Sequence, residues 1–447
     1  MFVVGESKRW FYPISAFFIT AFALSTGLWT MFYPNIIKVF EIAPDKTAPV
    51  FLASLFTGLG SMIMGPPIAG FIFDKKGPKV PALLAGFGII LGMFILSTML
   101  KQPTWAAARP LWYLGSFFVG FGGGLWGGTY TTTVARWFPD KIGTAMGLAV
   151  AGGGTGIIIM SPLAGYIIRS VGFSSTIFAV LGAMAFVMLV GVGFLFYGVP
   201  ATDWKPKGWV PPVSKNTGLE TVEKHFTLAE AVRDVRFWIL YGGFLCSAFA
   251  FMLFAQNASM ILVEGLTKGG LTSEEVVGNV VPTYLAFVAG VGFLGRFGWG
   301  WLMDKLGSPF KTLPLVYFSS GVMIWVFFMG YTSLTAVMIS AAILYFAFGG
   351  EPTVHYAAVP AIFGRKHIGK IMTSLNAFSV GIGIAAGPYV GAAIKDYTGG
   401  YYWAIVLAVV LRMMATGFSL TGFFVTKKLD AAEKAEADAI RASSKAS

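Results

Sequence analysis

Apolar and polar positions form long blocks along the chain. From Phe11 onward, apolar stretches of roughly 20 residues recur between short polar segments, and each is long enough to cross ~30 Å of hydrocarbon as an α-helix. The pattern predicts an all-α integral membrane protein with twelve transmembrane helices, over residues 11–33, 48–73, 80–100, 110–135, 144–168, 174–199, 237–263, 280–303, 312–331, 334–362, 370–394 and 400–426.

The longer polar segments predict the domain organisation. An N-terminal six-helix bundle (1–199) and a C-terminal one (237–426) flank a cytoplasmic linker (200–236), and a cytoplasmic tail follows (427–447). The linker ends in Thr227-Leu-Ala-Glu230, a capping-box pattern that predicts a short amphipathic helix lying on the membrane face. The tail has no apolar face, so we expect it to fray.

Charge follows the predicted topology. The chain is 56% hydrophobic and only 12% charged, too little polar surface for a water-soluble globule. With the N-terminus in the cytoplasm, the cytoplasmic segments hold 23 Lys and Arg and the external loops hold seven. This bias predicts a multi-pass protein of the cell (inner) membrane with both termini cytoplasmic, and it accounts for the net charge of +12 without nucleic-acid binding.

The two halves repeat each other. A shift of 226 residues places Gly123-Gly124 on Gly349-Gly350 and Tyr130 on Tyr356, and a shift of 230 places Asp74-Lys-Lys-Gly on Asp304-Lys-Leu-Gly. Two parallel six-helix halves are the architecture of major facilitator transporters. The two aspartate motifs resemble the acidic–basic–glycine motif of that superfamily, after spans two and eight, and imply a gating role for Asp74 and Asp304.

Two further segments resemble one branch of this superfamily. Ala135-Arg-Trp-Phe-Pro-Asp-Lys-Ile-Gly143 resembles the signature of the oxalate/formate antiporter-like transporters, related to the monocarboxylate transporters, and includes Arg136 and Asp140. Gly295-Arg-Phe-Gly-Trp-Gly-Trp-Leu-Met-Asp304 resembles their eighth span, whose arginine binds the substrate carboxylate. One departure matters: the oxalate transporters carry a second basic residue inside span eleven, and Ile371 to Ile394 has none, which favours a singly charged anion.

Arg296 is the sharpest signal for a binding site. It lies eight residues before Asp304, about 12 Å from the inner end of span eight and so near the midplane. A charge at that depth marks a site or is paired, and a guanidinium matches a carboxylate in two hydrogen bonds. We expect Gly292, Gly295, Gly298 and Gly300 to leave room around it.

Glu351 and His355 lie four residues apart on one face of span ten, near the depth of Arg296. A buried carboxylate and an imidazole can both exchange protons at physiological pH, which predicts proton coupling. The residues leave a second interpretation open: a permanent structural pair of Glu351 with Arg296 or with His355. The two overlap, because a pair that breaks on protonation is itself a coupling device.

Several other polar and aromatic residues are candidates. Trp126, Tyr130 and Tyr356 lie on spans four and ten and could pack or hydrogen-bond a carboxylate, although core packing explains them equally. Asn257 and Asn376 could contact the substrate or join helices. Arg412, deep in span twelve, is expected to turn inward to a carbonyl or an acid, or to snorkel outward. The glycine runs Gly122–Gly124 and Gly152–Gly154 predict close helix contacts where the halves rock.

Together these features predict a secondary active transporter rather than an enzyme, with no cofactor and no metal. The expected substrate is a short monocarboxylate (lactate, formate, acetate or pyruvate type), carried with a proton by a monomer in the lipid bilayer. The alternative is an oxalate-type dicarboxylate exchanger without proton coupling. A non-transporting membrane sensor would need a larger signalling domain than the linker or tail supplies, and a membrane enzyme would need clustered His, Asp or Cys.

Overall fold

Every regular element in the described part of the chain is a helix. The computed structural model describes residues 8–23, 28–138, 142–194, 198–200, 204, 206, 226–363, 371, 374–375 and 379–446. Long apolar stretches satisfy all their backbone hydrogen bonds within a helix, which is what a lipid environment demands.

The first six predicted spans form a group of helices that we call the N-half. Two of its spans contain π-helical segments, η3 and η4. Its elements are α1 (Phe11–Ala23), α2 (Trp29–Val39), α3 (Ala48–Phe51), α4 (Ala53–Gly58), η3 (Leu59–Met64), α5 (Gly65–Lys76), α6 (Lys79–Met99), α7 (Trp105–Trp137), α8 (Ile142–Val171), α9 (Ser175–Phe186) and η4 (Val187–Phe194).

The remaining spans form the C-half, which follows the short linker helix α10 (Leu228–Arg233). Thr227 and Glu230 make both hydrogen bonds of the predicted capping box, and Val232 is exposed beside them. The elements of the C-half are α11 (Val235–Lys268), α12 (Ser273–Glu275), η5 (Val276–Val280), α13 (Val281–Leu306), α14 (Pro309–Met329), α15 (Leu334–Phe363), α17 (Val380–Thr398) and α18 (Tyr402–Ala446).

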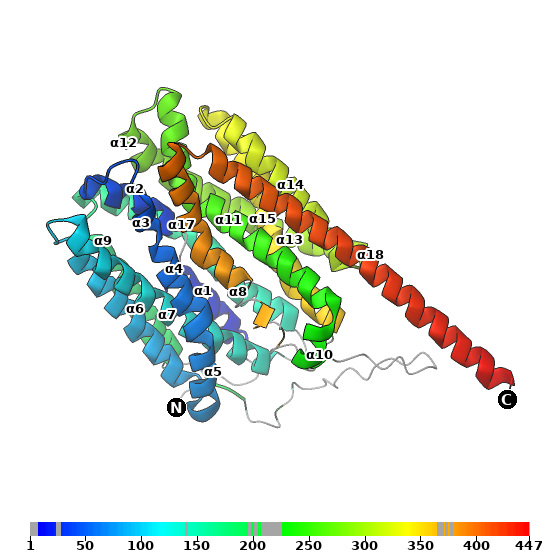
Figure 1. Cartoon of the computed structure of the whole chain (residues 1–447). Coiled ribbons are helices and arrows are strands. Elements are labelled where there is room, and N and C mark those ends of the chain that lie inside the picture. The colour runs from blue at the N-terminus through cyan, green and yellow to red at the C-terminus, as the bar shows by residue number, and fades with distance from the viewer. Residues whose placement is uncertain are drawn as a thin grey trace.

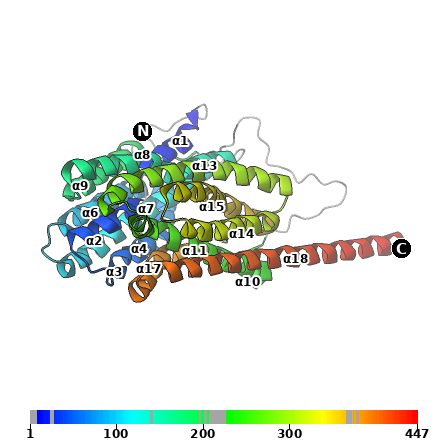
Figure 2. The ribbon, with the colours of Figure 1, turned by 90° about the horizontal axis from the view of Figure 1, so that it is seen from above.

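The predicted spans agree with the helices except near two ends. Within the described residues, nine helices are long and apolar enough to cross a membrane. The continuous helix α17 begins at Val380 rather than at residue 370, and most of the intervening residues lie outside the description. The expectation that the tail frays is wrong: α18 continues to Ala446 and projects beyond the bundle (Figures 1 and 2). Alanine, glutamate and lysine are strong helix formers, so the tail needs no apolar face to extend the helix.

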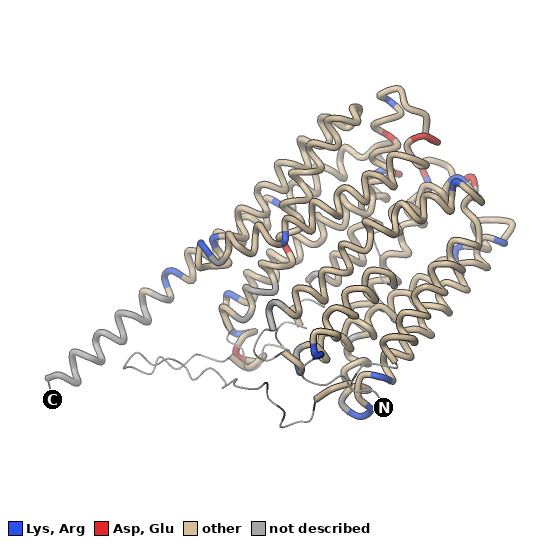
Figure 3. The backbone as a smooth tube through the Cα atoms, turned by 180° about the vertical axis from the view of Figure 1, so that it is seen from behind, with Lys and Arg blue, Asp and Glu red and all other residues tan. Residues whose placement is uncertain are grey.

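Each half packs mainly within itself. In the N-half α6 packs on α7 and α1 on α8, and in the C-half α13 packs on α15 and α11 on both α17 and α18. The halves meet where α8 contacts α13, α4 and α3 contact α17, and α2 contacts α11. Charged residues gather toward the two ends of the bundle (Figure 3). We call the end away from both chain termini, where the loops 40–47, 269–272 and 399–401 lie, the distal end (Figure 1).

Glycines set many of the closest helix contacts. Gly122 faces the backbone of Ala85 on α6, and Gly124 faces the backbone of Ser61 on η3. This run is therefore a close contact inside the N-half, not the expected contact between the halves. In the second run, by contrast, Gly154 faces Arg296 of the C-half.

Candidate functional site

Arg296 crosses from one half of the protein to the other. Its helix, α13, belongs to the C-half, and its Nη1 donates a hydrogen bond of 3.2 Å to the carbonyl oxygen of Ala151 on α8 in the N-half. The side chain is half-buried. Among the described residues no carboxylate pairs with it, so a neutral carbonyl is the partner that the structure gives this cation.

The glycines near Arg296 do not leave room around it, and the expectation from the sequence is wrong on this point. Gly295 lies against the carbonyl of Phe346, Gly298 lies against the ring of the same residue, and Gly292 faces Gly349. They let α13 approach α15 closely, as small residues do in membrane helix pairs. The Nε1 of Trp299 donates to the Phe346 carbonyl at 3.1 Å and fastens the same contact.

The aromatic candidates on α7 divide into a packing residue and a residue near the arginine. Trp126 is fully buried and donates from Nε1 to the hydroxyl of Thr20 on α1 at 3.2 Å. The ring centre of Tyr130 lies 5.6 Å from that of Trp126, and Tyr130 is within range of a through-space electrostatic interaction with Arg296. Trp126 therefore joins α7 to α1, whereas Tyr130 lies in the region of the arginine.

Asn257 joins helices. Its Nδ2 donates to the carbonyls of Leu253 at 2.8 Å and Pro388 at 3.0 Å, and its Oδ1 accepts from the hydroxyl of Tyr401 at 3.2 Å. The bond to Pro388 ties α11 to α17, and the bond from Tyr401 ties α11 to the start of α18. Asn376 and Asp140 lie outside the described residues.

Asp74 and Asp304 lie near the ends of α5 and α13, opposite the distal end, and Tyr356 lies on α15 next to His355. The side chains of these three residues lie outside the description. The guanidinium of Arg136 lies 4.9 Å from the ring centre of Phe73, the residue before Asp74. The structure thus brings the ends of α5 and α7 together.

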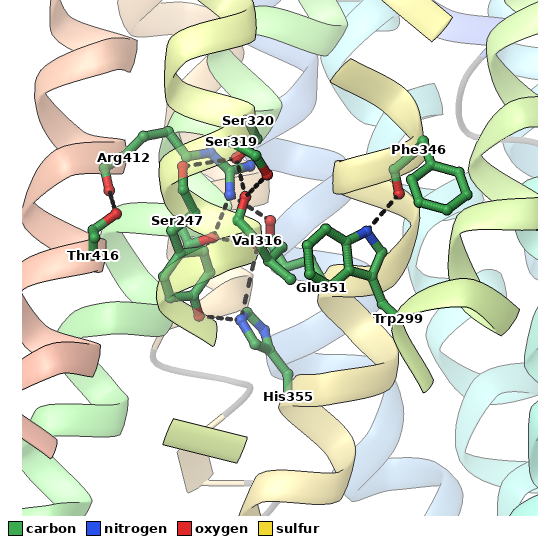
Figure 4. Close-up of polar contacts among 11 residues, drawn as sticks. Ser247, Trp299, Val316, Ser319, Ser320, Phe346, Glu351, His355, Arg412 and Thr416 are labelled. Carbon is green, nitrogen blue, oxygen red and sulfur yellow. Dashed lines mark hydrogen bonds and ion pairs between the residues drawn. The ribbon is translucent and has the colours of Figure 1, made fainter. Parts of the chain in front are cut away.

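A buried ionic cluster lies inside the C-half (Figure 4). Glu351 of α15 pairs with Arg412 of α18, at 2.5 Å between Oε2 and Nη1, and accepts a second hydrogen bond from the hydroxyl of Ser247 on α11. The same Nη1 donates to the Ser247 hydroxyl at 2.8 Å. Arg412 is fully buried, and its guanidinium carbon lies 4.5 Å from the ring centre of Phe348, a cation–π distance.

His355 extends this cluster one helical turn along α15. Its Nε2 lies 4.0 Å from the Glu351 carboxylate and is hydrogen-bonded to the hydroxyl of Tyr317 on α14. Its ring stacks on Phe244, with 3.8 Å between ring centres. An imidazole, a phenol and a carboxylate from α14 and α15 therefore lie together, with the carboxylate beyond direct hydrogen-bond distance of the imidazole.

Sequence reasoning found part of this cluster. Of the two pairings considered for Glu351, the one with His355 is present, while the cation that binds the carboxylate is Arg412 rather than Arg296. Arg412 turns inward to an acid, one of the outcomes expected for it. Ser247 and Tyr317 were missed, because a hydroxyl within an apolar span carries no signal of its partner.

The two halves are joined at the distal end. The carboxylate of Asp396 on α17 accepts from the Thr47 hydroxyl at 2.6 Å and from the backbone N–H of Ala48 at 2.5 Å. Lys38 pairs with Glu274 at 2.7 Å. Further hydrogen bonds between described residues join the halves in the distal part of the bundle, from Thr30 to Ser259, Ser54 to Ala385, Ser161 to Pro282 and Arg169 to Gly278. The structure is therefore closed at the distal end.

Known proteins similar to this chain are membrane transporters. The oxalate:formate antiporter of Oxalobacter formigenes is 25% identical over 94% of this chain and 92% of its own length. Monocarboxylate transporter 13 of Rattus norvegicus is 23% identical over 92% of this chain and 88% of its own. The crystal structure of the E. coli fucose:proton symporter FucP superposes with a TM-score of 0.59 at 15% identity, over 92% of this chain and 98% of that one.

The family assignment rests on a match along most of the chain. The family model of the Major Facilitator Superfamily matches residues 18–355, from α1 of the N-half to His355 in the C-half. With two six-span halves that meet around α8 and α13 and relatives that are transporters, the protein is a multi-pass membrane transporter and not an enzyme. The chain belongs to the major facilitator superfamily.

Proposed function

We propose that the protein is a secondary active transporter of a short monocarboxylate, such as lactate, formate, acetate or pyruvate, which it carries together with a proton. The observation that carries the proposal is the state of Arg296: a cation at the junction of the halves, bound among described residues to a neutral carbonyl alone. A carboxylate would bind a guanidinium more strongly than that carbonyl does, through two charge-assisted hydrogen bonds. Tyr130 lies within electrostatic range of the arginine and is a candidate for contact with the rest of the substrate.

The basic side chains within and next to the spans favour a substrate with a single negative charge. Span eleven carries no basic residue between Ile371 and Ile394. Lys395, which follows it, is bound at the distal end, where its Nζ donates to the carbonyl of Pro44 and lies 3.6 Å from Asp396. Arg412 is neutralised by Glu351. Among the described residues of the membrane interior, Arg296 is thus the cation left for the anion, and a second carboxylate on the substrate would lie there without a partner.

Proton coupling is assigned to Glu351 and His355. Protonation of Glu351 would remove the charge that holds Arg412, and so weaken the link between α15, α18 and α11. A buried ion pair that loses one of its charges is strongly destabilised, so protonation of Glu351 can change how the helices of the C-half pack. Arg296 lies on α13, which packs directly on α15, so a change in the cluster can reach the anion site.

The alternative is exchange of oxalate or another dicarboxylate without a proton. It is favoured by the Oxalobacter relative, which is named an oxalate:formate antiporter, whereas the name of the rat relative favours a monocarboxylate. The two functions differ in whether net uptake needs a substrate on the opposite side of the membrane.

The test is uptake of radiolabelled lactate, formate and oxalate into proteoliposomes, with and without an inward proton gradient. We expect a monocarboxylate to accumulate with the gradient, and Arg296→Ala to lose that uptake. Lys101→Ala removes an exposed cation at the distal end and serves as the matched control. Uptake of oxalate alone, or only against a counter-substrate, would favour the exchanger, and wild-type uptake by Arg296→Ala would refute the assigned site.

A further inference from the structure

Gly154 lies directly beneath the guanidinium of Arg296. The three heavy atoms nearest to a Cβ added at this glycine all belong to that guanidinium, with Cζ at 2.9 Å, Nη1 at 3.1 Å and Nη2 closer still. Real Cβ atoms do not approach other atoms so closely, so any side chain at position 154 would displace the arginine. The planar group therefore rests on bare helix backbone of the opposite half.

Its neighbours in the glycine run have other roles. Gly152 lies against the backbone of Phe17, and Gly156 lies against the backbone of Ala21, so both set the contact of α8 with α1. A Cβ at Gly153 would meet one atom, Cγ2 of Thr20, at an ordinary 3.5 Å. The absence of a side chain at position 154 is thus tied to the arginine, not to the packing of α8 within the N-half.

The carbonyl that holds Arg296 lies one helical turn before Gly154. A helix carbonyl points toward the residues three and four positions later, which for Ala151 are Gly154 and Thr155. The Thr155 hydroxyl donates to the same oxygen at 2.9 Å. The Ala151 oxygen is therefore reachable because position 154 has no side chain, and it is shared between two side-chain donors.

We infer that Gly154 is a positioning residue for the transported carboxylate, acting through Arg296. It lets the guanidinium lie against the backbone of α8, with Nη1 on a shared, neutral acceptor that a charged carboxylate can replace. A carboxylate bound to Arg296 in this position is held between the two halves. The inference rests on the proposed role of Arg296. It identifies Gly154 as the residue that determines where the guanidinium of Arg296 lies.

The experiment compares Gly154→Ala with Gly153→Ala in proteoliposomes, with Arg296→Ala alongside. We expect Gly154→Ala to raise the KM for the monocarboxylate about tenfold or more, the size of a lost charge-assisted hydrogen bond. Gly153→Ala should stay within about twofold of wild type, since its Cβ makes an ordinary contact. Both variants should unfold at the same temperature as wild type without substrate.

An Arg296→Lys background separates positioning from packing. The lysine ammonium is a single group without the planar fork, so adding Gly154→Ala to Arg296→Lys should weaken substrate-induced thermal stabilisation no further. If Gly154→Ala does not accumulate in membranes, recovery by Arg296→Ala supports the inference, and failure to recover overturns it.

The outcomes distinguish the two proposals. Wild-type KM for Gly154→Ala beside inactive Arg296→Ala overturns the inference and leaves the proposed function standing. An equal loss from Gly154→Ala in the wild-type and Arg296→Lys backgrounds also overturns it, because the glycine would then act through packing of α8. Wild-type transport by Arg296→Ala removes the proposed function, and the inference with it.

Discussion

Two arginines lie deep in this membrane protein, and their surroundings are opposite. Arg412 is fully buried, pairs with Glu351 at 2.5 Å and lies on the ring of Phe348. Arg296 is half-buried at the junction of the halves and donates to the carbonyl of Ala151 at 3.2 Å. Counting residues along each span places both arginines deep in the membrane, so depth alone does not identify a substrate site.

The difference lies in what neutralises each charge. An ionised group inside a membrane costs at least a few kcal/mol unless it is paired. The protein itself supplies partners for Arg412, Glu351 on α15 and Ser247 on α11, from the same half. For Arg296 it supplies a weak acceptor from the other half, so the stronger partner can come from outside. The first arrangement stabilises the C-half, and the second is suited to a ligand.

The largest expected effect is on stability, at the arginine that is already paired. Arg412→Leu leaves Glu351 buried without a cation, so we expect the free energy of unfolding to fall by about 3–5 kcal/mol. The double variant Arg412→Leu/Glu351→Leu should recover most of it, because both buried charges are gone. Thermal unfolding in detergent measures this, with Arg296→Leu as the control that should unfold nearly as wild type does. If Arg412→Leu and Arg296→Leu lowered the free energy of unfolding equally, the two arginines would not differ in their contribution to stability.

The next effect concerns coupling. Glu351→Gln cannot release a proton, so we expect accumulation of substrate driven by a proton gradient to fall about a hundredfold or more, the range of a lost proton-transfer group. Exchange of labelled for unlabelled substrate should persist. Glu264→Gln, at the distal end of α11 and paired with Lys268 at 2.9 Å, is the matched control. If Glu351→Gln still accumulates substrate, the cluster is purely structural.

The smallest effect concerns closure of the distal end. Asp396→Ala removes two hydrogen bonds across the halves, and we expect it to shift the balance toward opening by about 1 kcal/mol, or about fivefold. The readout is thiol labelling of Ser259→Cys, a position that bonds Thr30 across the halves, in a Cys246→Ala background. Asp45→Ala, exposed in the neighbouring loop, is the control. An unchanged labelling rate for Asp396→Ala would show that its carboxylate does not hold this end closed.

The sequence predicted the helices well because each span must satisfy its own backbone in lipid, which leaves a signal about 20 residues long. It placed Arg296 and Arg412 deep because depth follows from counting along one helix. It did not predict the partners of Arg412 or the carbonyl of Ala151 on α8, since these depend on how helices far apart in the chain cross. The same limit led to the wrong expectation for the glycines of α13, which serve contact with α15 instead of surrounding Arg296.

The long helix α18 has a mechanical consequence. Arg412 fixes it within the C-half, and the helix continues without a break to Ala446, about 51 Å further at 1.5 Å per residue. A rod held at one point acts as a lever: a tilt of about ten degrees at Arg412 would move its tip by about 9 Å over that length. A fluorophore at the tip would therefore magnify rocking of the C-half into a displacement that distance spectroscopy can follow during each transport cycle.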